Sequence, residues 1–358
     1  MRSPKRPTAY ARWSRGQGID VVPGFHIPDL RALPLKPWAR VGGEGVFINH
    51  DDSDRSNDCY VSRIPAGGSL HPVRHLHEVM IHVLSGRGST TVWGPGGEPR
   101  SFEWGTGSLF AIPLNLRYQH FNGSGEQPAT LLAVTNAPVV INLFDEAEFV
   151  FDCPYDFTAR YSGAAGYFGG EGTLTGRLWE SNFVPDVREF GLVDYRERGA
   201  GGTNVQFRLA RNTMMAHVSQ FPVGTYKKAH RHAPGAHVVI LGGTGYSLMW
   251  KEGEPVERFD WSAGSLVVPP GDTFHQHFNT GPAPARYLAL RHLNARRDPA
   301  TGLPMSSVST RLGGDQIDYA DESPAVREMY REACADNGVE PRMAEFHGTA
   351  RNTVRNRA

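Results

Sequence analysis

The sequence has few cysteines, no excess of charge of one sign and no long hydrophobic run. Cys59, Cys153 and Cys334 are too few and too far apart for a disulfide framework or a zinc knuckle, which favours a reducing compartment. Lys and Arg total 37 and Asp and Glu also total 37, so no electrostatic feature favours nucleic-acid binding. No stretch approaches the ~20 apolar residues of a membrane helix, and the N-terminus does not resemble a signal peptide. We therefore expect a cytoplasmic protein with no nucleic-acid or membrane partner.

What the sequence does contain is a long internal repeat. Shifted by 157 residues, the chain matches itself without a gap over about sixty positions, many of them rare residue types. We therefore expect a duplicated domain. The matched pairs include Pro65 and Pro222, Gly67 and Gly224, Trp93 and Trp250, Trp104 and Trp261, and the tetrapeptides beginning at Gln119 and Gln276.

Both copies show the pattern of short β-strands. Residues 238–241, 246–250 and 287–290 are rich in β-branched and aromatic residues and are bounded by Gly or Pro, which suggests a sandwich or barrel. The second copy also resembles the two sequence motifs of the cupin superfamily, with histidine at 237 where the common pattern has glutamate. This resemblance implies a double-stranded β-helix in each copy. It is carried by Gly224, His230-Arg-His232, His237, Gly243-Thr-Gly245, Pro269-Pro270-Gly271, His275 and Asn279.

We therefore predict an all-β fold with two cupin (jelly-roll) barrels from an internal duplication, an N-terminal arm and a C-terminal helical tail. Ser323 and Pro324 supply a cap and a first-turn proline for one helix over 325–335 in that tail. The predicted boundaries are 1–55 for the arm, 56–149 for barrel 1, 150–204 for a connector, 205–292 for barrel 2 and 293–358 for the tail.

Histidines are concentrated in barrel 2 at spacings that suit a metal site. Because alternate side chains of a strand share a face, His230 and His232 point the same way, and so do His275 and His277. A cluster of three or more imidazoles suits Fe, Zn, Cu or Ni, and a site with three histidine ligands leaves positions open for water, oxygen or substrate. We predict one divalent transition metal per chain, with His230, His232 and His275 as its ligands.

Two further histidines are candidate ligands or catalytic residues. His237 begins a strand whose next same-face residues, Val239 and Leu241, are apolar, which suggests that it faces inward as a fourth ligand. It could instead act as an acid or base beside the metal, or be structural. His277 is a second catalytic candidate, but its counterpart His120 favours a structural or supporting role.

Barrel 1 keeps only one of these four candidate ligands. His230, His237 and His275 correspond to Val73, Met80 and Tyr118, and only His232 keeps a histidine counterpart. We therefore predict that barrel 1 binds no metal. An alternative site there would use residues near that single retained histidine: His71, His75, His77, Glu78 and His82.

The motifs around His230 and His275 are also similar to those of the gentisate 1,2-dioxygenase group, which includes salicylate and 1-hydroxy-2-naphthoate dioxygenases. The resemblance implies a homo-oligomer (dimer or tetramer) with Fe(II) on His230, His232 and His275 that binds an aromatic acid and dioxygen. Two departures stand out. The family metallates its N-terminal barrel, and it has no histidine at the place of His237.

Several functions follow from these expectations. The first is an Fe(II) dioxygenase acting on a hydroxylated aromatic or enolisable carboxylic acid. The second is a non-oxidative isomerase, decarboxylase or lyase, in which Mn, Ni, Cu or Zn could replace iron as a Lewis acid. The third is a binding protein without catalysis. Candidate substrate-binding residues are Arg208, Arg291 and Tyr246, with Arg286 as a further cation; as ordinary surface or core residues they would have no such role.

Overall fold

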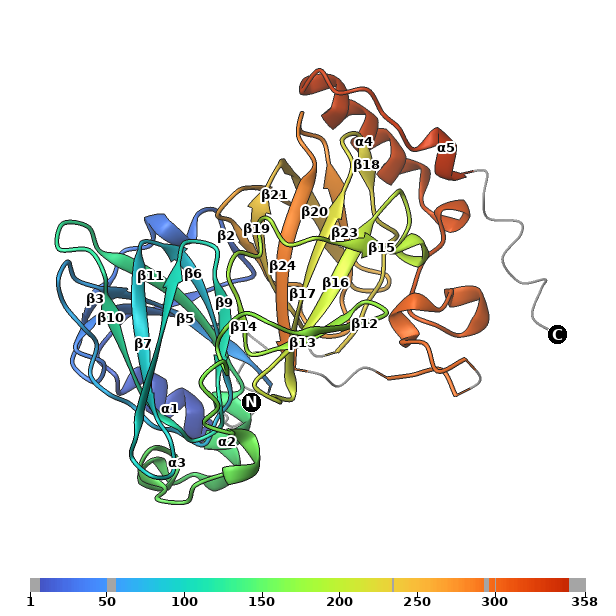
Figure 1. The fold of residues 1–358 in the computed structure, drawn as a ribbon. Helices are drawn as coiled ribbons and strands as arrows, with labels where there is room; N and C mark the ends of the chain where they lie inside the picture. Colours follow the sequence, from blue (N-terminus) through green and yellow to red (C-terminus); the bar gives the residue numbers. More distant parts are fainter. Residues whose placement is uncertain (1–6, 50–55, 234, 293–295, 300, 348–358) are drawn as a thin grey trace, which may run out of the picture.

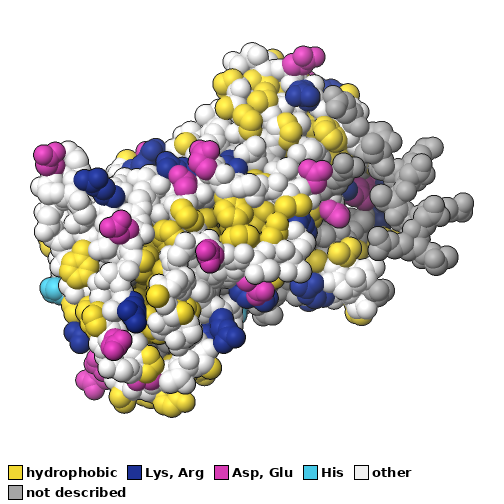
Figure 2. Space-filling model, viewed as in Figure 1, with side chains coloured by type: hydrophobic (Ala, Val, Ile, Leu, Met, Phe, Trp, Pro, Cys, Tyr) yellow, Lys and Arg dark blue, Asp and Glu magenta, His cyan; other side chains and the backbone are white. Residues whose placement is uncertain are grey.

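The computed structural model describes residues 7–49, 56–233, 235–292, 296–299 and 301–347. Its two β-barrels lie side by side, with the N-terminal residues against the first barrel and a helical C-terminal segment against the second (Figure 1). Lys and Arg side chains are interspersed with Asp and Glu on the face shown in Figure 2, in keeping with the balanced composition. None of the described helices is both long and apolar enough to cross a membrane.

Barrel 1 consists of a large sheet and a small three-stranded sheet, with apolar side chains between them. The large sheet contains β1 (Val21–Pro23), β3 (Lys36–Trp38), β4 (Gly43–Asn49), β5 (Asp58–Ile64), β6 (Val79–Ser85), β9 (Leu109–Ile112), β11 (Ala129–Thr135) and β14 (Phe183–Val184). The small sheet contains β7 (Arg87–Trp93), β8 (Pro99–Gly105) and β10 (Arg117–Asn122).

Barrel 2 repeats this architecture, and its interior also contains an apolar cluster. The large sheet contains β2 (His26–Ile27), β12 (Thr173–Thr175), β13 (Leu178–Ser181), β15 (Val193–Asp194), β16 (Thr203–Leu209), β17 (Met214–Phe221), β19 (His237–Gly242), β22 (Leu266–Val267) and β24 (Ala285–His292). The small sheet contains β18 (Thr225–Tyr226), β20 (Thr244–Trp250), β21 (Glu257–Ser262) and β23 (Phe274–Asn279).

The N-terminal residues are more ordered than the predicted arm. They form helix α1 (Ala9–Arg15) and the strands β1 to β4, of which β4 pairs with β5 of barrel 1. Strand β2 instead crosses to barrel 2 and pairs with β22, while β14 from the connector crosses back and pairs with β9 of barrel 1. The sequence did not reveal β4 because its two glycines, Gly43 and Gly45, weaken the strand pattern.

The two barrels meet along their large sheets, and we call this contact the seam. Its core combines side chains of barrel 1, such as Val61 and Val134, with side chains of barrel 2, such as Phe207 and Leu290, all fully buried. Each large sheet is therefore covered on both faces, by the seam on one side and by its own barrel interior on the other. Strands in this position carry apolar residues on both faces, so alternation alone does not tell which face is the interior.

Helices cover the ends and outer faces of the barrels. Helices α1, α2 (Ala137–Phe144) and α3 (Ala147–Asp152) pack together against barrel 1. Helix α4 (Pro324–Asp336) lies where the sequence predicts it, followed by the short α5 (Ala344–His347). Val326 and Tyr330 of α4 pack on the outer face of the small sheet of barrel 2, against Tyr226, Tyr246 and Phe278.

Candidate metal centre

Three histidines converge in barrel 2 as the spacing predicts. His230 lies beyond β18, where its backbone N–H donates to the carbonyl of His275 on β23 (3.1 Å) and the return bond measures 2.9 Å. This bridge fixes the two side chains on one side of the backbone. The possible ligand nitrogens of His230, His232 and His275 all lie within 4.8 Å of one another.

The protonation of these imidazoles suits a metal ion. Burial lowers the pKa of His275 to about 4 and, with Arg198 adding to the effect, lowers the pKa of His230 well below its usual value. Both rings therefore stay neutral near pH 7, and a neutral imidazole is the form that binds metal. The Nδ1 atoms of His230 and His275 lie 3.2 and 3.1 Å from the carbonyls of Lys228 and Thr273, which leaves Nε2 of each ring for the ion. The three residues fit a divalent transition metal with open coordination positions.

The interior next to these histidines is lined by cations. Lys227 is 1% exposed, and Arg291 lies on the same face of β24 as Tyr287 and Ala289, which belong to the apolar cluster of the interior. Burial lowers the pKa of Arg291, and the nearby Arg198 lowers it further. Neither Lys227 nor Arg291 forms an ion pair with a carboxylate of any residue that the structure describes. Buried positive charge without a counter-charge is unfavourable, so this region is suited to an anion.

Arg177 and Arg198 of the connector add further positive charge near this interior. The guanidinium of Arg177 lies 3.6 Å from the centre of the Tyr195 ring, and that of Arg198 lies 5.9 Å from it. Arg198 Nη1 also donates to the carbonyl of Ser306 (2.8 Å), which anchors it to the C-terminal segment. Burial favours a higher pKa for Tyr195, but Arg198, a hydrogen bond with Ser307 and Arg177 outweigh it and lower the pKa to about 8.

His237 does not join the other three histidines. Its Nδ1 lies 2.8 Å from Asn57 Nδ2, and its ring is grouped with Asp58 and Cys59 of barrel 1, their possible ligand atoms within 4.8 Å of one another. The expectation of a fourth ligand assumed that the apolar residues after His237 mark the barrel interior. They mark the seam instead, since Val239 belongs to the core shared by the two barrels.

His277 belongs to a hydrogen-bonded group that both barrels contain. In barrel 2 Trp261 Nε1 donates to Ser247 Oγ (3.0 Å), which lies 2.7 Å from His277 Nδ1. In barrel 1 the corresponding distances are 2.9 Å from Trp104 Nε1 to Thr90 Oγ1 and 2.7 Å from there to His120 Nδ1. Because this group occurs both in the barrel that has the candidate metal ligands and in the barrel that lacks them, it favours the structural interpretation of His277 over the catalytic one.

The candidate substrate-binding residues do not lie together in the structure. Arg208 is exposed and pairs with Glu180 (2.9 Å), and Arg286 donates to the connector carbonyl of Val187 (2.9 and 3.0 Å). Tyr246 stacks on Phe278 with ring centres 4.6 Å apart, on the outer face under α4, so the expectation that it binds substrate is wrong. Arg291 alone of these candidates lies on the interior face.

Three of the cations were missing from the sequence predictions. Lys227 carried a usable signal, because the repeat aligns it with Leu70, and a lysine in place of a core leucine is unusual. Arg177 and Arg198 carried no such signal, because they come from the connector, which lies outside the matched part of the repeat.

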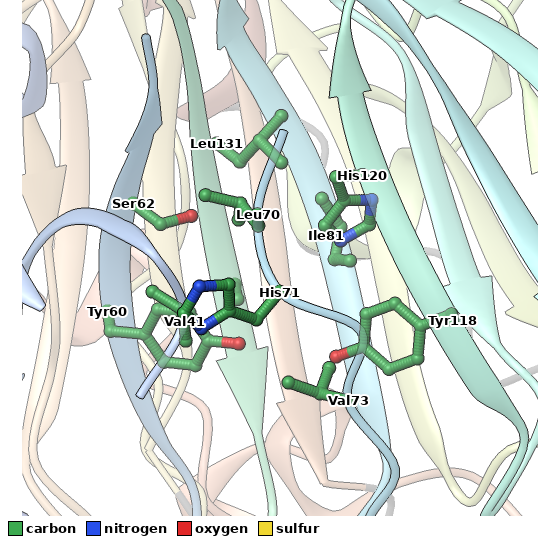
Figure 3. A pocket seen from close by; sticks show the side chains of 11 residues that line it. Val41, Tyr60, Ser62, Leu70, His71, Val73, Ile81, Tyr118, His120 and Leu131 are labelled. Carbon is green, nitrogen blue, oxygen red and sulfur yellow. The ribbon is translucent and has the colours of Figure 1, made fainter. Parts of the chain in front are cut away.

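In barrel 1 the position of the metal centre is filled by other side chains. Val73 and Tyr118 form the backbone bridge that His230 and His275 form in barrel 2, and Figure 3 shows them beside the cavity of barrel 1. The single retained histidine, His75, is hydrogen-bonded through Nε2 to the Tyr118 hydroxyl (2.9 Å). The absence of metal from barrel 1 stays a prediction, which this arrangement favours.

The alternative ligand cluster of barrel 1 is dispersed among other contacts. The rings of His75 and His77 stack with centres 3.7 Å apart, and His82 Nδ1 lies 3.2 Å from the Ser108 carbonyl. Glu78 points into the seam and accepts from the backbone of Thr213 (2.9 Å). Among the described residues these side chains form no group of three with ligand atoms close enough for one metal ion.

Comparisons with known proteins identify the fold. No family model and no curated protein matches the chain. Among solved structures, two single-residue variants of oxalate decarboxylase from Bacillus subtilis match with TM-scores of 0.50, 13% identity and coverage of 76% of this chain and 78% of theirs. A third structure, which describes the substrate binding mode and a reaction specificity switch in oxalate decarboxylase, matches with a TM-score of 0.51 and 13% identity. The match covers 82% of this chain and 84% of that one.

None of these three structures is a gentisate dioxygenase, so the comparisons support the predicted architecture without supporting that particular group. They cover about three quarters or more of the chain, and the duplication seen in the sequence accounts for its two barrels. This protein has the bicupin fold, with two jelly-roll barrels in one chain.

Proposed function

We propose that this protein is a metal-dependent cupin enzyme that acts on a small carboxylic acid without net oxidation. Barrel 2 holds one divalent transition metal on His230, His232 and His275. The observation that carries the proposal is the combination of these three converging imidazoles with Lys227 and Arg291, two cations without a carboxylate partner among the described residues. An anionic substrate would balance the charge of this interior.

The roles of the chain's own residues follow from this arrangement. The metal would supply a Lewis acid that polarises an oxygen of the substrate. Arg291 and Arg198 would bind and orient the substrate carboxylate from the side wall, because a guanidinium matches the two oxygens of a carboxylate. Burial of the site keeps water out, which strengthens each of these charge interactions.

Decarboxylation is the reaction that we would test first within this class. The similar solved structures are oxalate decarboxylases, and a carboxylate held by cations beside a Lewis acid is suited to the loss of CO₂. Isomerase and lyase reactions use the same site features and form the rest of the class. The donor set accepts manganese, iron and other divalent metals, so the metal is a separate experimental question.

An Fe(II) dioxygenase acting on a hydroxylated aromatic or enolisable acid is the second candidate. It is favoured by the three-histidine ligand set, since three protein ligands leave room for both an acid and dioxygen. The exclusion of His237 from this set removes the objection that a fourth ligand would take one of those positions. Oxygen consumption separates this candidate from the non-oxidative reaction.

The test begins with the metal content of untagged protein purified without chelators. We expect about one transition metal per chain. His232→Ala should abolish binding and His75→Ala, its counterpart in barrel 1, should leave it unchanged. The loaded protein is then supplied with oxalate and a panel of small dicarboxylic and 2-oxo acids.

Release of CO₂ without oxygen uptake would support the proposal. Oxygen uptake would move the function to the dioxygenase class. Metal binding that survives His232→Ala would show that the ligand assignment is wrong.

A further inference from the structure

Lys227 is an unusual residue for the interior of a small barrel. It follows β18 and is 1% exposed, and its Nζ lies 3.4 Å from the Tyr287 hydroxyl and 5.3 Å from the centre of the Phe221 ring. No carboxylate of a described residue pairs with it. Lysine is almost never fully buried without a charged partner, because removing the ammonium group from water costs free energy.

The duplicated barrel shows that the fold does not need this lysine. The backbone N–H of Lys227 donates to the carbonyl of His277 (3.1 Å), and that of Leu70 donates to the carbonyl of His120 (2.9 Å), so the two residues occupy the same position. In barrel 1 this position is an ordinary part of the apolar core.

The partner of Lys227 changes together with it. Tyr287 pairs with Ile240 across the β19–β24 ladder, and Leu131 pairs with Val83 at the same place in barrel 1. The lysine–tyrosine pair of barrel 2 is therefore a leucine–leucine pair, Leu70 and Leu131, in barrel 1. Figure 3 shows these two leucines together in the cavity of barrel 1.

The lysine–tyrosine pair occurs in the same barrel as the candidate metal ligands. The barrel with Lys227 has His230 and His275, while the barrel with Leu70 has Val73 and Tyr118 at those positions. The tryptophan–hydroxyl–histidine group, in contrast, is the same in both barrels. Residues that serve the fold are shared, so Lys227 belongs with the residues that serve the metal centre.

The surroundings of Lys227 make its amine suited to proton transfer. Burial and then the charge of Arg198 lower its pKa to about 7, although Tyr195 acts in the opposite direction. An amine in this range can both give and take a proton near neutral pH. The titratable and charged groups that face it are Tyr287 from β24, His277 from β23, His217 from β17 and, from the connector, Arg177, Tyr195 and Arg198.

We infer that Lys227 is a catalytic residue that donates the proton completing the reaction in barrel 2. The inference builds on the proposed function. When the bond between the substrate carbon and its carboxylate breaks, CO₂ leaves and the electron pair stays on the carbon. The ammonium of Lys227 gives its proton to that carbon and regains one from water. The net change consumes one proton and involves no gain or loss of electrons.

The test compares Lys227→Leu, which installs the residue of barrel 1, with Lys227→Arg and with the control Lys251→Leu. Lys251 is an exposed lysine directly after β20. We expect Lys227→Leu to keep its metal and to melt no lower than the wild type, since a buried amine is replaced by an apolar side chain. Decarboxylation should fall by about 100-fold or more in Lys227→Leu and in Lys227→Arg, which keeps the charge but cannot release a proton near pH 7. Lys251→Leu should stay near the wild-type rate.

A second measurement uses oxalate as a binding probe for the metal-loaded protein. Calorimetry in buffers of different ionisation enthalpy reports the protons taken up on binding. The wild type should take up a fraction of a proton at pH 7.5, because an added anion raises the pKa of the amine, and Lys227→Leu should take up less. A Lys227→Leu protein with the wild-type rate and the wild-type proton uptake would overturn the role of Lys227. A metal-loaded wild type that decarboxylates no acid would instead overturn decarboxylation as the reaction of barrel 2, on which the inference rests.

Discussion

Removing the charge of Glu78 should weaken the seam between the barrels. Its side chain is 4% exposed and accepts hydrogen bonds from the backbone of Thr213 and Met214 (2.9 Å each), from the Thr213 hydroxyl (2.8 Å) and from Arg160 (2.8 Å). In Glu78→Gln an amide N–H₂ group replaces one oxygen and faces donors, while Arg160 loses its counter-charge. Breaking a fully buried ion pair costs about 3–5 kcal/mol, and because Arg160 is 23% exposed we expect about 2–4 kcal/mol here.

The measurement is urea unfolding followed by tryptophan fluorescence, with Glu180→Gln as the matched control. Glu180 pairs with Arg208 at 2.9 Å, but both side chains are exposed, so that variant should lose less than about 1 kcal/mol. Equal stability losses in the two variants would refute the reasoning, since they would show that the burial of Glu78 in the seam does not strengthen its contacts. Metal content should be unchanged in both, because neither residue touches the metal centre.

Three further predictions concern buried histidines and a serine bonded to one of them. His237→Ala should keep the full metal content and lose stability instead, because this side chain lies in the seam; elemental analysis that shows lost metal would contradict this. Ser247→Ala should destabilise barrel 2 by about 1–3 kcal/mol in a denaturant titration, since it leaves a buried tryptophan N–H without its acceptor, and an unchanged midpoint would count against that structural role. Burial lowers the pKa of His75 to about 4 and of His120 to about 3, so below pH 6.5 the unfolded chain binds protons that the folded chain does not. Stability should therefore fall as the pH drops from about 6.5 toward 4, by up to about 1.4 kcal/mol per pH unit for each group, and a flat profile over this range would disprove it.

The repeat, the strand pattern and the cupin resemblance predicted the two barrels, and the histidine spacing predicted the three histidines that converge in barrel 2. Both depend on local geometry: alternation places His230 and His232 on one side, and the matching tetrapeptides place His275 and His277 on an equivalent strand. The predicted helix also follows from local signals, with Pro324 in its first turn.

What the sequence did not predict depends on contacts between distant segments. The position of His237 required knowing that the large sheet of barrel 2 is covered on both faces, because the apolar residues after it face barrel 1. Arg177 and Arg198 reach the site from a connector with no repeat to align, and Arg198 is placed there by the carbonyl of Ser306. Such placements arise from how the chain packs over the barrel, which periodicity does not encode.

The duplication provides a control for assigning function inside a single chain. The two barrels have the same ladder registers and the same buried tryptophan–hydroxyl–histidine group, so equivalent positions have similar surroundings to fill. Where both barrels have the same residue at equivalent positions, as for His120 and His277, the fold explains that residue. Where barrel 2 has a buried charged side chain at a position that is apolar in barrel 1, as with Lys227 and Leu70, packing does not explain the charged residue. The reverse exchange Leu70→Lys should therefore destabilise barrel 1 by several kcal/mol, because it would bury an ammonium group in an apolar core.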